Sequence, residues 1–136
     1  MTNELLLIDD DKFFIMMAKK MVAKCALHPS PLTFENGRLA LDHLKEVYNT
    51  ENVFILLLDI NMPIMDGWGL LEGLKAFASP ENTFVVMVTS STDEADIKKA
   101  HQSPFVVDYL TKPLMSHTLN RLRDIPALHP FFLPKN

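Results

Sequence analysis

Residues 53–67 read VFILLLDINMPIMDG, an uninterrupted apolar run followed directly by an aspartate. All six residues from Val53 to Leu58 are apolar, so the run lacks the polar alternation of a strand with one face in water. A strand has this composition when helices cover both faces of a parallel sheet. We therefore predict a buried parallel strand here, with Asp59 at its carboxyl end.

Four other short apolar runs are strand candidates, and stretches with helical periodicity separate them. The runs are Leu5–Ile8, Leu32–Phe34, Phe84–Val88 and Phe105–Leu110, of which the second is the shortest. Between the runs, apolar residues recur three and four positions apart, as they do on one face of a helix. These residues are Met17, Ala18, Met21, Val22 and Cys25; Ala40, Leu41, Leu44, Val47 and Tyr48; Leu70, Leu71, Leu74, Phe77 and Ala78; and Met115, Leu119 and Leu122.

The fourth helical stretch is mostly polar, and local signals mark its start. Ser91 and Glu94 have the spacing of a capping box, and Glu94 forms an i,i+4 pair with Lys98. We predict that Ser91 caps this helix and that it is the most exposed helix of the fold. Strand and helix thus alternate five times, which predicts an α/β fold with right-handed crossovers and an open parallel sheet.

The length of 136 residues fits one domain, which we place at residues 1–125. Residues 126–136 contain three prolines and are predicted to form an irregular tail. We expect Phe131, Phe132 and Leu133 to fold back onto the domain; the alternative is that they contact a partner or a second copy of the chain.

Bulk composition excludes several classes of protein. The net charge of −4 argues against nucleic acid as a partner, because binding to phosphates requires an excess of Lys and Arg. A single cysteine, Cys25, excludes an internal disulfide. The sequence has no secretion signal and no apolar run long enough to cross a bilayer, so we expect a cytoplasmic protein without a membrane partner.

Polar residues follow the predicted strands at the edge where function gathers in doubly wound sheets. They are Asp9, Asp10 and Asp11 after the first strand, Asp59 after the third, Thr89 and Ser90 after the fourth, and Lys112 and Pro113 after the fifth. Crowded carboxylates repel one another unless a cation intervenes, and Mg²⁺ prefers such oxygen ligands. A carboxylate can also accept a phosphoryl group covalently, and a lysine and a hydroxyl can stabilise that group.

Each of these residues also has a purely structural interpretation. The Asp9–Asp11 cluster suits a helix N-terminus, and Asp59 alone suits a turn at the end of a strand. Thr89 alone suits the start of a helix, and Lys112 alone suits a solvated surface. The functional interpretation is favoured because all four features fall at strand ends of one predicted sheet.

Four segments together resemble a known family. LLLIDDDK (5–12), LLLDINMPIMDGW (56–68), MVTSS (87–91) and YLTKPL (109–114) resemble the CheY-like receiver domains of two-component response regulators. The resemblance extends from Leu5 to about Leu122. It implies a flavodoxin-like (βα)5 fold, with a doubly wound, five-stranded parallel sheet in three α/β/α layers.

The resemblance also implies roles for the acidic residues. Asp59 resembles the phosphoacceptor. Asp9 and Asp10 resemble the acidic pair that holds Mg²⁺ or Mn²⁺ together with Asp59, with Asp10 as a direct ligand and Asp9 acting largely through water. Asn61 resembles the position whose backbone carbonyl binds the same metal.

The remaining site residues resemble the parts of the family's switch. Thr89 resembles the switch hydroxyl, with the small Ser90 leaving access to the phosphoryl group. Lys112 resembles the lysine that contacts the phosphoryl group, and Tyr109 the aromatic residue that turns inward. Two features support these groups by resemblance, namely the cis bond expected before Pro113 and the turn into the third helix at Asp66 and Gly67.

Two stretches depart from the family pattern. The segment from Asp11 to Asp59 is a few residues longer than is usual in the family, and the extra residues are expected near Tyr48–Asn52. HQSPF (101–105) replaces the glycine turn that usually precedes the fifth strand. Neither departure removes a group that the chemistry requires.

The resemblance implies a single-domain response regulator that accepts a phosphoryl group on Asp59. Its expected partners are a sensor histidine kinase or a histidine phosphotransfer protein, and a downstream protein that binds the face of the fourth helix, fifth strand and fifth helix. We expect a monomer or a phosphorylation-dependent homodimer with autophosphatase activity but no separate catalytic output. One alternative is a receiver-like interaction module that is not phosphorylated. A second is a phosphatase of the haloacid-dehalogenase type, but Asn61 stands where such an enzyme has a second aspartate. A third is a nucleotide-binding flavodoxin-like protein, but the glycine-rich phosphate loop of such a protein is missing.

Overall fold

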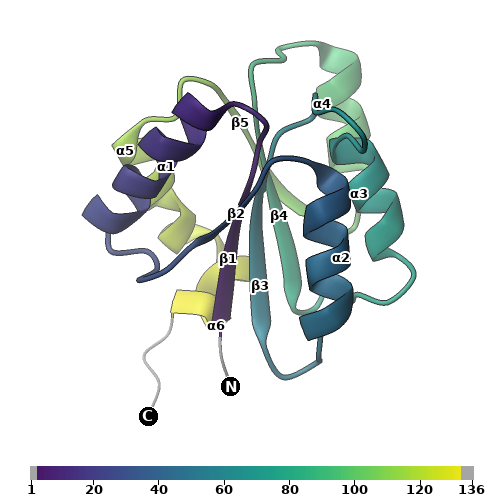
Figure 1. Ribbon diagram of the computed structural model, residues 1–136. Helices are drawn as coiled ribbons and strands as arrows, with labels where there is room; N and C mark the ends of the chain where they lie inside the picture. The colour runs from purple at the N-terminus through teal and green to yellow at the C-terminus, as the bar shows by residue number, and fades with distance from the viewer. Residues whose placement is uncertain (1–2, 133–136) are drawn as a thin grey trace.

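The structure is a computed structural model that describes residues 3–132. Five parallel strands form one sheet in the order β2-β1-β3-β4-β5 (Figure 1). The strands are β1 (Asn3–Ile8), β2 (Leu32–Phe34), β3 (Val53–Leu58), β4 (Thr83–Thr89) and β5 (Val106–Thr111). This order is that of a doubly wound, flavodoxin-like sheet, and it confirms the predicted fold class. Every predicted strand is present: β2 and β3 have the predicted bounds, and the other three differ by one or two residues at an end.

Helices cover both faces of the sheet and make three layers (Figure 1). The helical elements are α1 (Lys12–Lys24), α2 (Gly37–Val47), α3 (Gly67–Leu74), α4 (Glu94–His101), α5 (Ser116–Asn120) and α6 (His129–Phe132), with 3-10 turns η1 (Arg121–Asp124) and η2 (Pro126–Leu128). One face carries α1, α5 and α6, and the other carries α2, α3 and α4. Over the described residues, no helix is long and apolar enough to cross a membrane.

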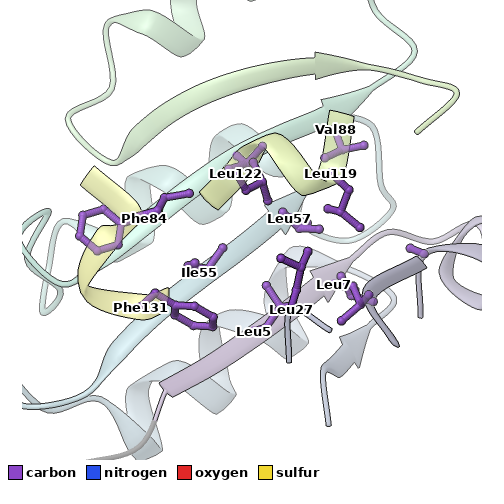
Figure 2. Close-up of a cluster of buried hydrophobic side chains, with 14 of the residues drawn as sticks. Leu5, Leu7, Leu27, Ile55, Leu57, Phe84, Val88, Leu119, Leu122 and Phe131 are labelled. Atoms are coloured by element: carbon purple, nitrogen blue, oxygen red, sulfur yellow. The ribbon is translucent and has the colours of Figure 1, made fainter. Parts of the chain in front are cut away.

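The core has two halves because successive side chains of a strand point to opposite faces of the sheet. Leu5 and Leu7 of β1 join the half beneath α1, α5 and α6, which Figure 2 shows in close-up. Leu6 and Ile8 of the same strand join the half beneath α2, α3 and α4. All six residues of β3 are buried, as the apolar run Val53–Leu58 predicts. The sheet is therefore a rigid base for the polar residues at its carboxyl edge.

The start of α4 differs from its prediction. Asp93, and not Ser91, is the N-cap residue, and its side chain accepts a hydrogen bond from the backbone N–H of Ala95. The hydroxyl of Ser91 donates instead to the carboxylate of Asp96 at 2.6 Å. The predicted capping box is wrong because the Ser91 hydroxyl bonds to the carboxylate of Asp96, and Asp93 accepts the helix N–H in its place.

The predicted irregular tail is wrong for the part of it that the structure describes. Residues 126–132 form η2 and α6, which return the chain to the sheet. Leu128 is fully buried and Phe131 is 6% exposed, and both belong to the core half in Figure 2. The expected return of Phe131 and Phe132 to the domain is confirmed, whereas Leu133 lies outside the described residues.

Candidate functional site at the carboxyl edge of the sheet

Three carboxylates from two strand ends meet at the carboxyl edge of the sheet. Asp9 and Asp10 follow β1, Asp59 follows β3, and each offers an oxygen that lies within 4.8 Å of the other two. Asp9 is 2% exposed and Asp59 is 8% exposed, whereas Asp10 faces solvent. Adjacent parallel strands explain the meeting, because their carboxyl ends lie at one edge and Ile8 pairs with Leu58 in register.

Lys112 brings a positive charge between the two buried carboxylates. Its Nζ lies 2.7 Å from Asp9 Oδ2 and 3.4 Å from Asp59 Oδ2. The ammonium group also lies 4.2 Å from the centre of the Phe14 ring, a cation–π contact that restricts the side chain from its other side. The Lys112–Pro113 peptide bond is cis, as predicted. The lysine thus reaches the same pocket as the acids, although more than 50 residues separate it from Asp59 in sequence.

Burial and ion pairing act on the same groups in opposite directions. Burial raises the pKa of Asp9, and the hydrogen bonds from Lys112 and from the backbone N–H of Asp11 only partly offset this effect. For Lys112, burial lowers the pKa, but the hydrogen bond from its ammonium to Asp9 and the charges of Asp9 and Asp59 outweigh it and raise the pKa. The lysine therefore stays charged, and the carboxylate pair retains an excess of negative charge that suits an added cation.

The donor set fits Mg²⁺ or Mn²⁺. All three groups are carboxylates, which are the hard oxygen ligands that these ions prefer, and the exposed Asp10 leaves the site open to water ligands. Asn61 is exposed in the loop after Asp59. The role of its backbone carbonyl as a metal ligand stays a prediction.

The turn between β3 and α3 holds Asp59 in place. Asp59 Oδ1 accepts a hydrogen bond from the N–H of Ile60 at 2.8 Å, and Gly67 N–H donates to the carbonyl of Ile60 at 2.8 Å. A Cβ atom at Gly67 would lie 2.6 Å from the backbone oxygen of Asp59, so this close approach requires glycine. Asp66 caps α3 by accepting from the N–H of Gly69. Asp66 and Gly67 therefore form the predicted turn into the third helix.

The predicted switch residues lie at the end of β4, the strand next to β3, and on β5. Thr89 ends β4 and is 1% exposed, and its carbonyl accepts the backbone N–H of Lys112 at 2.8 Å. Ser90 is exposed beside it. The Tyr109 ring is half-buried, and its hydroxyl donates to the carbonyl of Ser91 at 2.9 Å. Burial raises the pKa of Tyr109, the Ser91 hydrogen bond opposes the rise, and the charges of nearby carboxylates add to it.

Sequence reasoning did not single out two supporting groups, since it offered a helix N-terminus only for the Asp9–Asp11 cluster as a whole. Asp11 is the N-cap of α1, with Oδ1 accepting from the N–H groups of Phe13 and Phe14, so it holds the helix and stands outside the carboxylate cluster. Phe14 is the second group, because its ring contacts Lys112. The aspartate that precedes the helical period was the available signal for the cap. The ring contact had no local signal, since it joins residues 98 positions apart.

Comparison with known proteins identifies the family. The model of the response regulator receiver domain matches residues 5–123, which is most of the chain. The chain belongs to the response regulator receiver family. Family membership connects this receiver to phosphorylation-based two-component signalling, as its sequence motifs predicted.

Relatives differ in how much of their own length this receiver covers. It is 33% identical over 119 residues to the Two-component response regulator ORR26 of Oryza sativa subsp. japonica, covering 86% of this chain but only 19% of that protein. It is 29% identical to the Chemotaxis protein CheY homolog of Campylobacter jejuni, covering 90% of this chain and 91% of the relative.

Solved structures share the architecture. A two-component response regulator from Cytophaga hutchinsonii is 29% identical, with a TM-score of 0.78 over 93% of this chain and 97% of the other. A response regulator receiver protein from Dyadobacter fermentans is 25% identical, with a TM-score of 0.78 over 98% of this chain and 100% of the other.

Proposed function

We propose that this receiver accepts a phosphoryl group on Asp59 from a phosphohistidine, in a reaction that requires Mg²⁺ or Mn²⁺, and signals by binding another protein in its phosphorylated form. The observation that carries the proposal is the position of Lys112, whose Nζ lies 2.7 Å from Asp9 and 3.4 Å from Asp59. The pocket thus holds an acceptor, a fixed cation and two further carboxylates for a metal ion.

Asp59 is suited to nucleophilic attack because its two oxygens have different surroundings. Oδ1 accepts the N–H of Ile60, which fixes the carboxylate plane, and Oδ2 faces Lys112. A metal ion held by Asp9, Asp10 and Asp59 would supply charge neutralisation to the phosphoryl oxygens. As the phosphoryl group transfers, Lys112 moves its interaction from Asp9 to a phosphoryl oxygen.

The new group then recruits the switch. A phosphoryl group adds about −1.5 to −2 charge and three strong acceptors. The hydroxyl of Thr89 turns to donate to one of them, and Tyr109 responds at the same loop. Water later hydrolyses the acyl phosphate, so the domain has autophosphatase activity but no separate catalytic output.

The donor docks on α1 beside the pocket. This helix carries four lysines and no acidic residue, whereas the whole chain has a net charge of −4. Phe13 is 67% exposed, and together with Met17 and Met115 it lines a groove of about 490 Å³ that reaches Lys112. A phosphohistidine-bearing helix with apolar and acidic residues fits such a surface, which supports a sensor histidine kinase or a histidine phosphotransfer protein as the partner.

The output surface is the face of α4, β5 and α5, since α4 begins next to Thr89 and β5 carries Tyr109. We expect the protein to act in the cytoplasm, without nucleic acid or membrane partners, as a monomer or a phosphorylation-dependent homodimer. A receiver-like module that binds without phosphorylation is the alternative, and it needs none of the charges in the pocket.

Labelling with a small phosphodonor tests the proposal. With acetyl phosphate and Mg²⁺, the wild-type protein gains one hydroxylamine-labile phosphoryl group by mass spectrometry, and chelation of the metal prevents the gain. Asp59→Asn loses the label, whereas Asp108→Asn on the edge strand β5 keeps it. Labelling of Asp59→Asn at the wild-type level would exclude Asp59 as the acceptor, and an unlabelled wild-type protein would favour the non-phosphorylated module.

A further inference from the structure

Ser91 is the meeting point of the switch, because each of its polar groups binds a different part of it. Its N–H donates to Thr89 Oγ1 at 3.3 Å, and its carbonyl accepts the hydroxyl of Tyr109 at 2.9 Å. Its own hydroxyl donates to Asp96 Oδ2 at 2.6 Å. One residue of the β4–α4 loop therefore connects the end of β4, the ring on β5 and the first turn of α4.

The contact with Asp96 is the strongest of the three. It is the shortest, and its acceptor is a carboxylate, so it is a charge-assisted hydrogen bond. The backbone N–H of Asp93 adds a longer contact of 3.3 Å to the same hydroxyl. Ser91 and Asp96 are both partly shielded from solvent, whereas Glu94 in the same turn is exposed. Ser91 is thus held more firmly to α4 than to Thr89.

We propose that Asp96 is a positioning residue of the switch, which fixes Ser91 to α4 so that a turn of Thr89 moves Tyr109 and the start of α4 together. We call the residues Thr89, Ser91, Asp96 and Tyr109 the Ser91 latch. This inference rests on the proposed function, because phosphorylation of Asp59 is what turns Thr89. It goes beyond that function by assigning transmission to a side chain that touches none of the reacting groups.

The latch makes a prediction that separates transmission from chemistry. Asp96→Ala removes the acceptor of the Ser91 hydroxyl but leaves the pocket of Asp9, Asp59 and Lys112 intact. Phosphorylation by acetyl phosphate and Mg²⁺ therefore proceeds at a rate within about twofold of wild type. The movement of Tyr109 that accompanies phosphorylation is lost.

The ring of Tyr109 reports this movement directly. The chain has two tyrosines, so incorporation of 3-fluorotyrosine gives two ¹⁹F resonances, which Tyr48→Phe assigns. In the wild-type protein the Tyr109 resonance shifts on phosphorylation. In Asp96→Ala and in Ser91→Ala, the latch predicts a shift at least about twofold smaller, because the carbonyl that binds the hydroxyl is no longer fixed to α4.

Two matched variants make the test specific. Glu94→Ala removes the same charge from the same turn of α4 without touching Ser91, so it keeps the full shift. Asp96→Asn retains an oxygen that accepts the Ser91 hydroxyl, so it is expected to keep the shift. It tests the hydrogen bond even if Asp96→Ala folds poorly. Three results would each overturn the latch. They are a full Tyr109 shift in Asp96→Ala, a loss of the shift in Glu94→Ala as large as in Asp96→Ala, and a wild-type Tyr109 resonance that does not shift on phosphorylation. Failure of the wild-type protein to be labelled at all would instead overturn the proposed function.

Discussion

Lys112 faces two carboxylates, and its charge has opposite effects on a metal ion and on a phosphoryl group. The ammonium offsets part of the negative charge of Asp9 and Asp59 in the metal-free protein, so it competes with a bound cation for the same oxygens. In the proposed function it would stabilise a phosphoryl group, whose charge is negative. The two effects can be separated by removing the charge while keeping the length of the side chain.

Lys112→Met is expected to bind Mg²⁺ at least as tightly as wild type and to be phosphorylated at least about tenfold more slowly, which corresponds to about 1.4 kcal/mol of lost stabilisation. Isothermal titration measures the first effect and acetyl phosphate labelling the second. Lys98→Met on the exposed side of α4 is the charge-matched control. Parallel losses of metal binding and labelling in Lys112→Met would show that the lysine has only a structural role.

The raised pKa of Asp9 predicts how stability and metal binding depend on pH. The Asp9 carboxyl of the folded protein holds its proton more tightly than that of the unfolded chain, which has the ordinary pKa of 3.8. The contribution of Asp9 to the stability of the metal-free protein therefore falls as pH rises from 3.8 through the folded-state pKa. Mg²⁺ must displace the proton. The increase in melting temperature caused by Mg²⁺ is therefore smaller at the low-pH end of this window than at neutral pH.

Asp9→Asn removes one titrating group of the site and makes the Mg²⁺ effect less dependent on pH across the same window, as thermal melts with and without the metal would record. Asp42→Asn, an exposed site on α2, is expected to leave the wild-type dependence unchanged. A Mg²⁺ effect that stays constant with pH in the wild-type protein would contradict the assigned role of Asp9.

At the scale of elements, loops at the opposite edge of the sheet are joined by one buried side chain. Asn82 precedes β4, and its Nδ2 donates to the carbonyls of Asn49 and Asn52 at 2.8 Å each. Its Oδ1 accepts the hydroxyl of Tyr48 at 2.6 Å. The α2–β3 connection, which is predicted from the sequence to be long for the family, is thus held against the α3–β4 connection.

Asn82→Ala leaves two carbonyls and a hydroxyl without this partner, so we expect the free energy of unfolding to fall by about 2–3 kcal/mol. Tyr48→Phe removes two hydrogen bonds, the one its hydroxyl donates to Asn82 and the one it accepts from the N–H of Ser79, and keeps the ring contacts with Phe54 and Phe77. We expect a loss of about 1–3 kcal/mol. Urea denaturation measures both. Equal midpoints for Asn82→Ala and wild type would show that water replaces these hydrogen bonds at no cost.

The sequence predicted those elements whose signals are local. Continuous apolar runs located β1, β3 and β4 because burial on both faces leaves few polar positions, and shorter or mixed runs located the edge strands β2 and β5. The strand ends then located Asp9, Asp59 and Lys112. The start of α4 was mispredicted because Ser91 can either cap the helix or bond to Asp96, and the spacing of Ser91 and Glu94 does not distinguish the two arrangements. The nearby Asp93 takes the place of the cap, since its carboxylate accepts the N–H of Ala95.

At the scale of the whole molecule, the carboxyl-terminal segment completes the core. The regular helix α5 ends at Asn120, and Arg123 in the following 3-10 turn donates to the carbonyls of Cys25 and Ala26 at the end of α1. Phe131 then lies in the core half of Figure 2, and its carbonyl accepts the side-chain N–H of Asn3. These hydrogen bonds join residues 97 to 128 positions apart, so no local pattern predicted them, and three prolines suggested a tail instead.

Leu128→Ala is expected to lower the free energy of unfolding by about 2–4 kcal/mol, because it creates a cavity beneath the sheet. His129→Ala, at an exposed neighbouring position, is expected to change it by less than about 0.5 kcal/mol. Chemical denaturation compares the two. A Leu128→Ala protein as stable as wild type would mean that this segment does not belong to the cooperative fold.

The central claim is that the pocket holds a metal ion and a phosphoryl group between its carboxylates and Lys112. A crystal structure grown with Mg²⁺ and beryllofluoride, an analogue of the phosphoryl group, tests it most directly. We predict a beryllofluoride adduct on the Asp59 carboxylate, a metal ion bound by Asp10 and Asp59, and Lys112 Nζ moved from Asp9 to a fluorine. An unmodified Asp59 with Lys112 still bound to Asp9, or an adduct on another side chain, would contradict it.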